Sequence, residues 1–265
     1  NQSLIVTIED LYAPTNIDLS TSTSFIESST KKSSWSGFSF QERRNQRSFA
    51  AIKDDGSVVT WGALSSGGDS NSVADDLASG ISQIYSTAYA FAALKDDGSV
   101  VTWGNSSFGG DSNSVADDLA SGVSQIFATE YAFAALKDDG SVVTWGSLSS
   151  GGDSNSVTDD LANGVSKIFS AIAAFAALKD DGSVVTWGNA LWGGQSSSIS
   201  YLISSGVSQI FSTDAAFAAL KDDGSVISWG DSDYGGDSNS VAADLSSGVS
   251  QIFSTDAAFA ALKDD

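Results

Sequence analysis

The pattern of hydrophobic and polar residues repeats every 42 residues along most of the chain. The apolar run Ala-Phe-Ala-Ala-Leu is followed by the polar turn Lys-Asp-Asp-Gly-Ser and then by Val-Val-Thr-Trp-Gly, as in residues 90–104. A repeat of this length is typical of a supersecondary unit that buries its apolar face only by stacking on its neighbours. The tryptophans of the motif are equally spaced: Trp61, Trp103, Trp145, Trp187 and Trp229.

Each unit contains two β-rich runs around an Asp-Asp-Gly turn, which predicts a tight hairpin with strands at 90–95 and 100–103. Both faces of the first strand are apolar, as expected for a sheet packed between two other sheets. A variable tetrapeptide and a Gly-Gly-Asp-Ser segment then predict a loop. Residues 114–119 predict one helical turn and residues 123–129 predict a third strand.

Three or four short strands in each unit predict an all-β fold, a β-propeller preceded by a short N-terminal strand and a linker. A parallel β-solenoid is the alternative, but solenoid coils usually have shorter rungs and no hairpin turn. The predicted units are 48–89, 90–131, 132–173, 174–215 and 216–257, with a partial unit at 258–265.

The chain lacks cysteine, histidine and methionine, which excludes disulfides, thiol chemistry, histidine bases and the usual zinc or copper ligands. We therefore expect no metal and no cofactor. Residues 1–47 are electrically neutral, so the repeats carry the whole net charge of −21. Such a surface repels phosphate, and no nucleic-acid partner is expected. No apolar run is long enough to cross a membrane, so no membrane insertion is expected.

The repeated motif, preceded by Gly-Val-Ser-Gln-Ile-Phe, resembles the repeat of the regulator-of-chromosome-condensation family, whose bacterial members include a propeller-type β-lactamase inhibitor protein. The resemblance covers residues 48–265 and implies a β-propeller, with blade number and ring closure left open. The family's Gly-Gln-Leu-Gly loop is replaced here by Gly-Gly-Asp-Ser, and its frequent histidine is missing. The nucleotide-exchange, chromatin and inhibitor activities of family members are therefore not carried over to this chain.

A second resemblance lies at the N-terminus, where an alternating strand is followed by Ala-Pro-Thr-Asn-Ile-Asp-Leu-Ser at 13–20. This segment is similar to the junction between successive cadherin-like domains of very large bacterial surface proteins. Residues 1–20 would then be the end of such a domain and its junction, and the Ser/Thr-rich residues 21–47 a linker with a degenerate strand. The chain begins without Met and stops inside a turn, so we expect it to be a piece of a longer polypeptide.

Carboxylates recur at two places in the units, and both patterns favour structure over chemistry. The Asp pairs, from Asp54-Asp55 to Asp222-Asp223, stand before a glycine, as a hairpin turn requires, whereas catalysis needs one asymmetric site. The aspartates of the Gly-Gly-Asp-Ser loops match no known calcium spacing, so calcium is not expected to be required. These are Asp69, Asp111, Asp153 and Asp237.

Aromatic residues also occupy two kinds of position. The repeated tryptophans, which follow two valines, predict an interblade core. The tetrapeptides 63–66, 105–108, 147–150, 189–192 and 231–234 differ while their flanks do not. Because variable loops on a rigid scaffold often carry binding residues, the candidate ligand contacts are Phe108, Trp192 and Tyr234.

These observations predict a non-catalytic structural or adhesive module of a large secreted or cell-surface protein, located outside the cell or at its surface. Its partners would be other protein domains or surface glycans, and self-assembly is left open. The alternatives are a carbohydrate-binding or glycoside-active domain and a structural repeat of an extracellular filament or surface layer. A glycoside-active enzyme needs a pair of acids in one cleft, whereas nearly every acid here is repeated, so we expect no enzyme.

Overall fold

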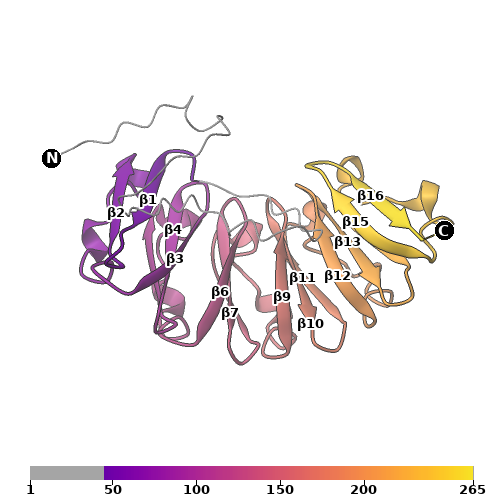
Figure 1. Ribbon diagram of the computed structural model, residues 1–265, viewed down its shortest axis with the longest axis horizontal. Helices are drawn as coiled ribbons and strands as arrows, with labels where there is room; N and C mark the ends of the chain where they lie inside the picture. The colour runs from indigo at the N-terminus through magenta and orange to yellow at the C-terminus, as the bar shows by residue number, and fades with distance from the viewer. Residues whose placement is uncertain (1–44, 265) are drawn as a thin grey trace.

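The structure is a computed structural model that describes residues 45–264. The predicted N-terminal strand and junction, and the linker as far as residue 44, lie outside the described residues. Residues 45–264 form six antiparallel sheets that stand side by side in one curved row (Figure 1). Four sheets have three strands, and the sheet at each end of the row has two.

Each three-stranded sheet is a meander in chain order. The sheets are β3 (Ile81–Ser86), β4 (Ala90–Lys95) and β5 (Val100–Gly104); β6 (Val123–Ala128), β7 (Ala132–Lys137) and β8 (Val142–Gly146); β9 (Val165–Ser170), β10 (Ala174–Lys179) and β11 (Val184–Gly188); and β12 (Val207–Ser212), β13 (Ala216–Lys221) and β14 (Val226–Gly230). The end sheets are β1 (Ser48–Ile52) with β2 (Val58–Gly62), and β15 (Val249–Ser254) with β16 (Phe259–Lys263).

The Asp-Asp-Gly turn joins the second and third strands of each sheet, as predicted. The backbone N–H of Lys95 donates to the carbonyl of Ser99 at 2.9 Å, and that of Gly98 donates to Lys95 at 3.0 Å. Gly98 has a φ of +78°, a conformation that favours glycine. The predicted third strand of one unit, β6, pairs with the first strand of the next unit, β7, so the sheets straddle the borders of the 42-residue units.

Neighbouring sheets pack face to face through the central strand. Ala90, Ala92 and Leu94 of β4 lie in one buried cluster with Phe133 and other residues of the following sheet. The alternate residues of β4, Phe91 and Ala93, lie in a second cluster with the sheet that precedes it. Both faces of the strand are therefore buried, as the sequence predicted, and the small alanines let the sheets approach closely.

The repeated tryptophans lie between the sheets. Trp103 stacks on Phe91 with 5.2 Å between ring centroids, and its indole Nε1 donates to the carbonyl of Gly67 in the preceding unit at 3.1 Å. Trp145, Trp187 and Trp229 make the same bond to the unit before them. The predicted interblade core is therefore confirmed for these four residues, whereas Trp61, in the first described sheet, is partly exposed.

Short 3₁₀ helices correct two of the predictions. The variable tetrapeptides, predicted as plain loops, contain η2 (Leu64–Ser66), η4 (Ser106–Phe108), η6 (Leu148–Ser150), η8 (Ala190–Trp192) and η9 (Ser232–Tyr234). The predicted helical turn is also 3₁₀ and begins one residue earlier, in η3 (Asn71–Val73), η5 (Asn113–Val115), η7 (Asn155–Val157) and η10 (Asn239–Val241). In the tetrapeptides, the three residues between a strand and a glycine leave no room for a full α-turn. After the second set the chain does make one α-type bond, as from the N–H of Leu119 to the carbonyl of Val115 at 3.1 Å.

The first strands of successive sheets, β3, β6, β9, β12 and β15, lie next to one another. The turns that follow them are joined by a line of backbone hydrogen bonds, one for each unit. The N–H of Ala88 donates to the carbonyl of Glu130 at 2.9 Å, and the N–H of Glu130 donates to Ile172 at 2.9 Å. The line is continued by the N–H of Gln46, which donates to the carbonyl of Ala88 at 3.2 Å, and by the N–H of Ile172, which donates to Asp214 at 2.7 Å. The N–H of Asp214 donates in turn to the carbonyl of Asp256 at 2.8 Å. These bonds fix the position of each turn relative to the next.

The chain is thus an all-β row of propeller-type blades, and the predicted fold class is confirmed. The described row is open, because β1 and β16 lie at its opposite ends (Figure 1). Within residues 45–264 no helix is long and apolar enough to cross a membrane.

Candidate functional site

Two loops of each unit lie together at one end of the sheets. In a three-stranded meander, the turn between the first two strands and the segment after the third strand are at the same end, opposite the Asp-Asp-Gly turn. The N–H of Asn105 donates to the carbonyl of Tyr89 at 2.9 Å, and the Thr87 hydroxyl donates to the carbonyl of Phe108 at 3.0 Å. We call this end the variable rim: residues 45–47, the inner turns 87–89, 129–131, 171–173, 213–215 and 255–257, and the five variable tetrapeptides.

The inner turns vary between units as strongly as the tetrapeptides do. The last two residues of each turn are Ala-Tyr, Glu-Tyr, Ile-Ala, Asp-Ala and Asp-Ala, while the strands on either side are nearly constant. The predictions from sequence missed these positions, although they carry the same signal as the tetrapeptides. Apart from residues 195–204, where the fourth unit departs from the others, variation in the repeats is therefore concentrated on a single edge of the molecule.

Aromatic rings form a short column on the variable rim. The Tyr89 and Tyr131 rings stack with centroids 6.3 Å apart and an interplanar angle of 7°. The ring of Phe108 lies 5.1 Å from Tyr89 and 5.0 Å from Tyr131, tilted against both. The Arg47 guanidinium lies over the Tyr89 ring at 5.4 Å. We call Arg47, Tyr89, Tyr131 and Phe108 the aromatic column.

A carboxylate adjoins the end of this column. Burial raises the pKa of the Tyr131 hydroxyl, and a hydrogen bond to the Glu130 carboxylate and the negative charge of that group raise it further. Since the ordinary tyrosine pKa is already near 10 and this shift raises it, the Tyr131 hydroxyl keeps its proton at neutral pH. The column therefore ends in a neutral ring beside an acceptor.

The structure brings only one of the three predicted contact residues into the aromatic column. Phe108, Trp192 and Tyr234 occupy the last position of their tetrapeptides, and all three are half-buried. The Thr213 hydroxyl donates to the carbonyl of Tyr234 at 2.9 Å, as the Thr87 hydroxyl does to Phe108. The backbone of Tyr234 is therefore held against its inner turn in the same way as that of Phe108. Within residues 45–264 no ring stacks on Trp192 or Tyr234.

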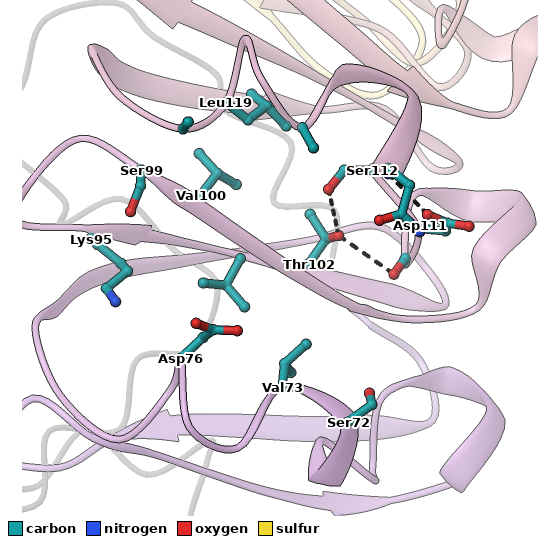
Figure 2. A pocket seen from close by; sticks show the side chains of 15 residues that line it. Ser72, Val73, Asp76, Lys95, Ser99, Val100, Thr102, Asp111, Ser112 and Leu119 are labelled. Atoms are coloured by element: carbon teal, nitrogen blue, oxygen red, sulfur yellow. Dashed lines mark hydrogen bonds between the residues drawn. The ribbon is translucent and has the colours of Figure 1, made fainter.

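A groove of about 460 Å³ lies between the first two units, away from the variable rim. Figure 2 shows the Thr102 hydroxyl pointing toward Ser112, at 2.9 Å, with a longer bond of 3.5 Å to the carbonyl of Gly110. The same bonds recur in the next unit, where Thr144 donates to Ser154 at 3.0 Å and to the carbonyl of Gly152 at 3.3 Å. The polar groups of the groove are thus repeated and used internally, which favours a structural role.

The second Asp of each Asp pair holds its turn together. The hydroxyl and the N–H of Ser99 donate to Asp97 Oδ1 at 2.6 and 2.9 Å. These bonds lower the pKa of the Asp97 carboxyl, and the corresponding serines lower the pKa of Asp55, Asp139, Asp181 and Asp223. The turn role predicted for the pairs is confirmed. Between residues 45 and 264 no three acidic side chains are grouped closely enough to hold a metal ion.

This arrangement predicts how stability depends on pH. A carboxyl whose pKa is lower in the folded state stabilises the fold above its unfolded pKa, and that stabilisation is lost as the pH falls below about 4. A variant with Asn at the second Asp of all five pairs keeps the acceptor oxygen but does not titrate. We expect its melting temperature to fall less between pH 5 and pH 2 than that of the wild type.

The matched control carries Asn at the first Asp of each pair, which removes the same number of charges. Its melting temperature should retain the wild-type dependence on pH. Equal slopes for the two variants in differential scanning calorimetry would mean that the serine bonds do not set the acid response.

No protein-family model matches the chain. A search of curated proteins also finds no match. Solved structures do match, over part of their length. The ectodomain of the receptor kinase CR4 from Physcomitrella patens is 16% identical with a TM-score of 0.42, covering 71% of this chain and 49% of that chain. Yeast RCC1 (Prp20), solved with Kap60, is 18% identical with a TM-score of 0.44, covering 71% of this chain and 55% of that chain.

Human WBSCR16 is 18% identical with a TM-score of 0.39, covering 70% of this chain and 60% of that chain. The chain therefore spans between about half and three fifths of the length of these structures. Yeast RCC1 bears the name of the family that the 42-residue motif resembles.

Proposed function

We propose that this chain is a non-catalytic binding module whose variable rim contacts a partner outside the cell or at its surface. The observation that carries the proposal is the coincidence of sequence variation and aromatic side chains on one edge of a scaffold whose strands are nearly uniform. Uniform strands make a rigid support, and function is usually carried by the loops on such a support. Tyrosine and arginine, both present in the aromatic column, are enriched among the residues that dominate binding energy.

The acids favour binding over catalysis. The second Asp of each pair accepts bonds from its own turn, and the loop aspartates accept the N–H two residues on, as Asp111 does from Asn113 at 2.9 Å. A glycosidase needs two carboxyl groups about 5–10 Å apart that differ in environment. Most of the acids recur from unit to unit in the same environment, and repetition of this kind does not distinguish a general acid from a general base.

The proposal is tested with the whole chain and a panel of immobilised extracellular-matrix proteins and surface glycans. The test variant is Y89A/F108A/Y131A, and the matched control is D97N/D139N, which alters the opposite end of the same two sheets. We expect at least one saturable interaction that weakens tenfold or more in the test variant and stays within twofold in the control.

Thermal unfolding of both variants shows whether they remain folded. Binding that survives in the test variant, that falls equally in the control, or that is absent across the panel would contradict the proposed role of the variable rim.

A further inference from the structure

The aromatic column follows the repeat of the fold. Arg47, Tyr89 and Tyr131 occupy the same position, the last residue of the inner turn, in three successive units. Backbone bonds between the turns set the offset from unit to unit, so each of these side chains lies over the next. The result is one stacked side chain for each unit, with Arg47 on Tyr89 and Tyr89 on Tyr131.

The column stops at Tyr131. The next residue at this position is Ala173, which is buried and presents no ring. The residue that corresponds to Phe108 in this unit is Ser150, which is also buried and small. In the part of the chain that the structure describes, only Tyr89 and Phe108 contribute rings to Tyr131, so its face toward Ala173 has no stacking partner.

Two features of the structure define what fits this face. The stacking of Arg47 on Tyr89, one step earlier, shows that the column accepts a guanidinium group at the spacing of the fold. Glu130 precedes Tyr131 in the same inner turn, and its carboxylate lies near enough to raise the pKa of the Tyr131 hydroxyl, so a negative charge stands beside the ring. The repeats carry the whole net charge of −21, which attracts basic partners.

We propose that the face of Tyr131 on which no ring stacks, with Glu130 beside it, binds the guanidinium group of an arginine on a basic protein partner. This inference rests on the proposed function of the variable rim and names the chemistry that it recognises. A guanidinium is planar and weakly hydrated, so it stacks on a tyrosine face and bonds a neighbouring carboxylate at once. An ammonium is compact and strongly hydrated and gains less from the ring. A neutral sugar can donate hydrogen bonds to Glu130 but lacks the attraction between opposite charges.

The test measures the binding of tetra-arginine and tetra-lysine peptides to the whole chain by titration calorimetry at matched ionic strength. Diffuse attraction to the acidic surface is the same for both peptides, so their ratio reports the stacking site. We expect tetra-arginine to bind about three- to tenfold more tightly, as a partly exposed cation–π contact allows. Y131A should abolish the preference, Y131F should keep it, and E130Q should weaken tetra-arginine more than tetra-lysine.

Tyr201 gives the matched control, because it is an exposed tyrosine outside the variable rim and Y201A should leave the preference unchanged. Equal affinities for the two peptides, or a preference that survives in Y131A, would overturn the inference. Displacement of tetra-arginine by neutral oligosaccharides would also overturn it, in favour of a sugar site. If the peptides fail while Y89A/F108A/Y131A still loses its panel partner, the proposed function stands and only the guanidinium chemistry is wrong.

Discussion

Replacing Trp145 with alanine is expected to lower the free energy of unfolding by about 3–5 kcal/mol. Its side chain is 2% exposed between two sheets, and its indole N–H bonds the unit before it. The substitution removes the ring contacts, leaves a cavity and leaves the carbonyl of Gly109 without its donor. Urea unfolding followed by circular dichroism measures the loss.

Trp61 provides the matched control, since it holds the same position of the repeat but is 43% exposed. We expect W61A to cost less than half as much as W145A. Equal losses would show that stability depends on the tryptophan's place within its own sheet and not on the contact between sheets.

Replacing Gly110 with alanine is expected to cost about 3 kcal/mol or more, because an added Cβ would lie 2.5 Å from the backbone carbon and oxygen of Gly104. Backbone atoms at this distance cannot move aside without opening the junction between the third strand and the variable rim. The melting temperature and the binding activity of the rim should therefore both fall.

The control for this prediction is Gly122→Ala. Gly122 has a φ of +73°, but an added Cβ would meet only the end of the flexible Lys137 side chain at 3.7 Å. The G122A substitution should lower the free energy of unfolding by about 1–2 kcal/mol, which is the cost of holding an alanine in the left-handed backbone conformation. A G110A variant as stable as G122A would contradict the close backbone approach in the structure.

The strands and their burial could be predicted from sequence because they follow from short apolar runs that recur at a fixed spacing. A central strand with Phe and Ala on one face and Ala and Leu on the other has no polar side to turn to water, so it must lie between two sheets. The Asp-Asp-Gly turn was equally readable, since its bonds join residues two positions apart, as Asp97 and Ser99 show.

The aromatic column could not be assembled in the same way. Tyr89 and Tyr131 are 42 residues apart, and they meet only because the inner turns are held in line by backbone bonds between units. The variation at these turns was visible in the sequence, but their nearness to the tetrapeptides depends on strand order. Phe108 could be singled out because its own tetrapeptide varies between units. Its ring partners, Tyr89 and Tyr131, could not be assigned to it, because their nearness depends on the fold.

The neighbours of a variable residue decide whether it joins a cluster. Trp192 and Tyr234 share the position of Phe108, but the inner turns beside them carry Ala173, Ala215 and Ala257 instead of tyrosines. That Phe108, Trp192 and Tyr234 contact a ligand remains a prediction for all three residues.

The most direct test of the variable rim is hydrogen exchange measured by mass spectrometry on the whole chain, with and without its tightest-binding panel partner. The proposed function predicts slower exchange at residues 87–89, 105–108 and 129–131 in the complex. Exchange at the Asp-Asp-Gly turns, 96–99 and 138–141, should not change. Protection confined to those turns, or to residues 111–113 at the groove, would show that the partner binds elsewhere and would contradict the account.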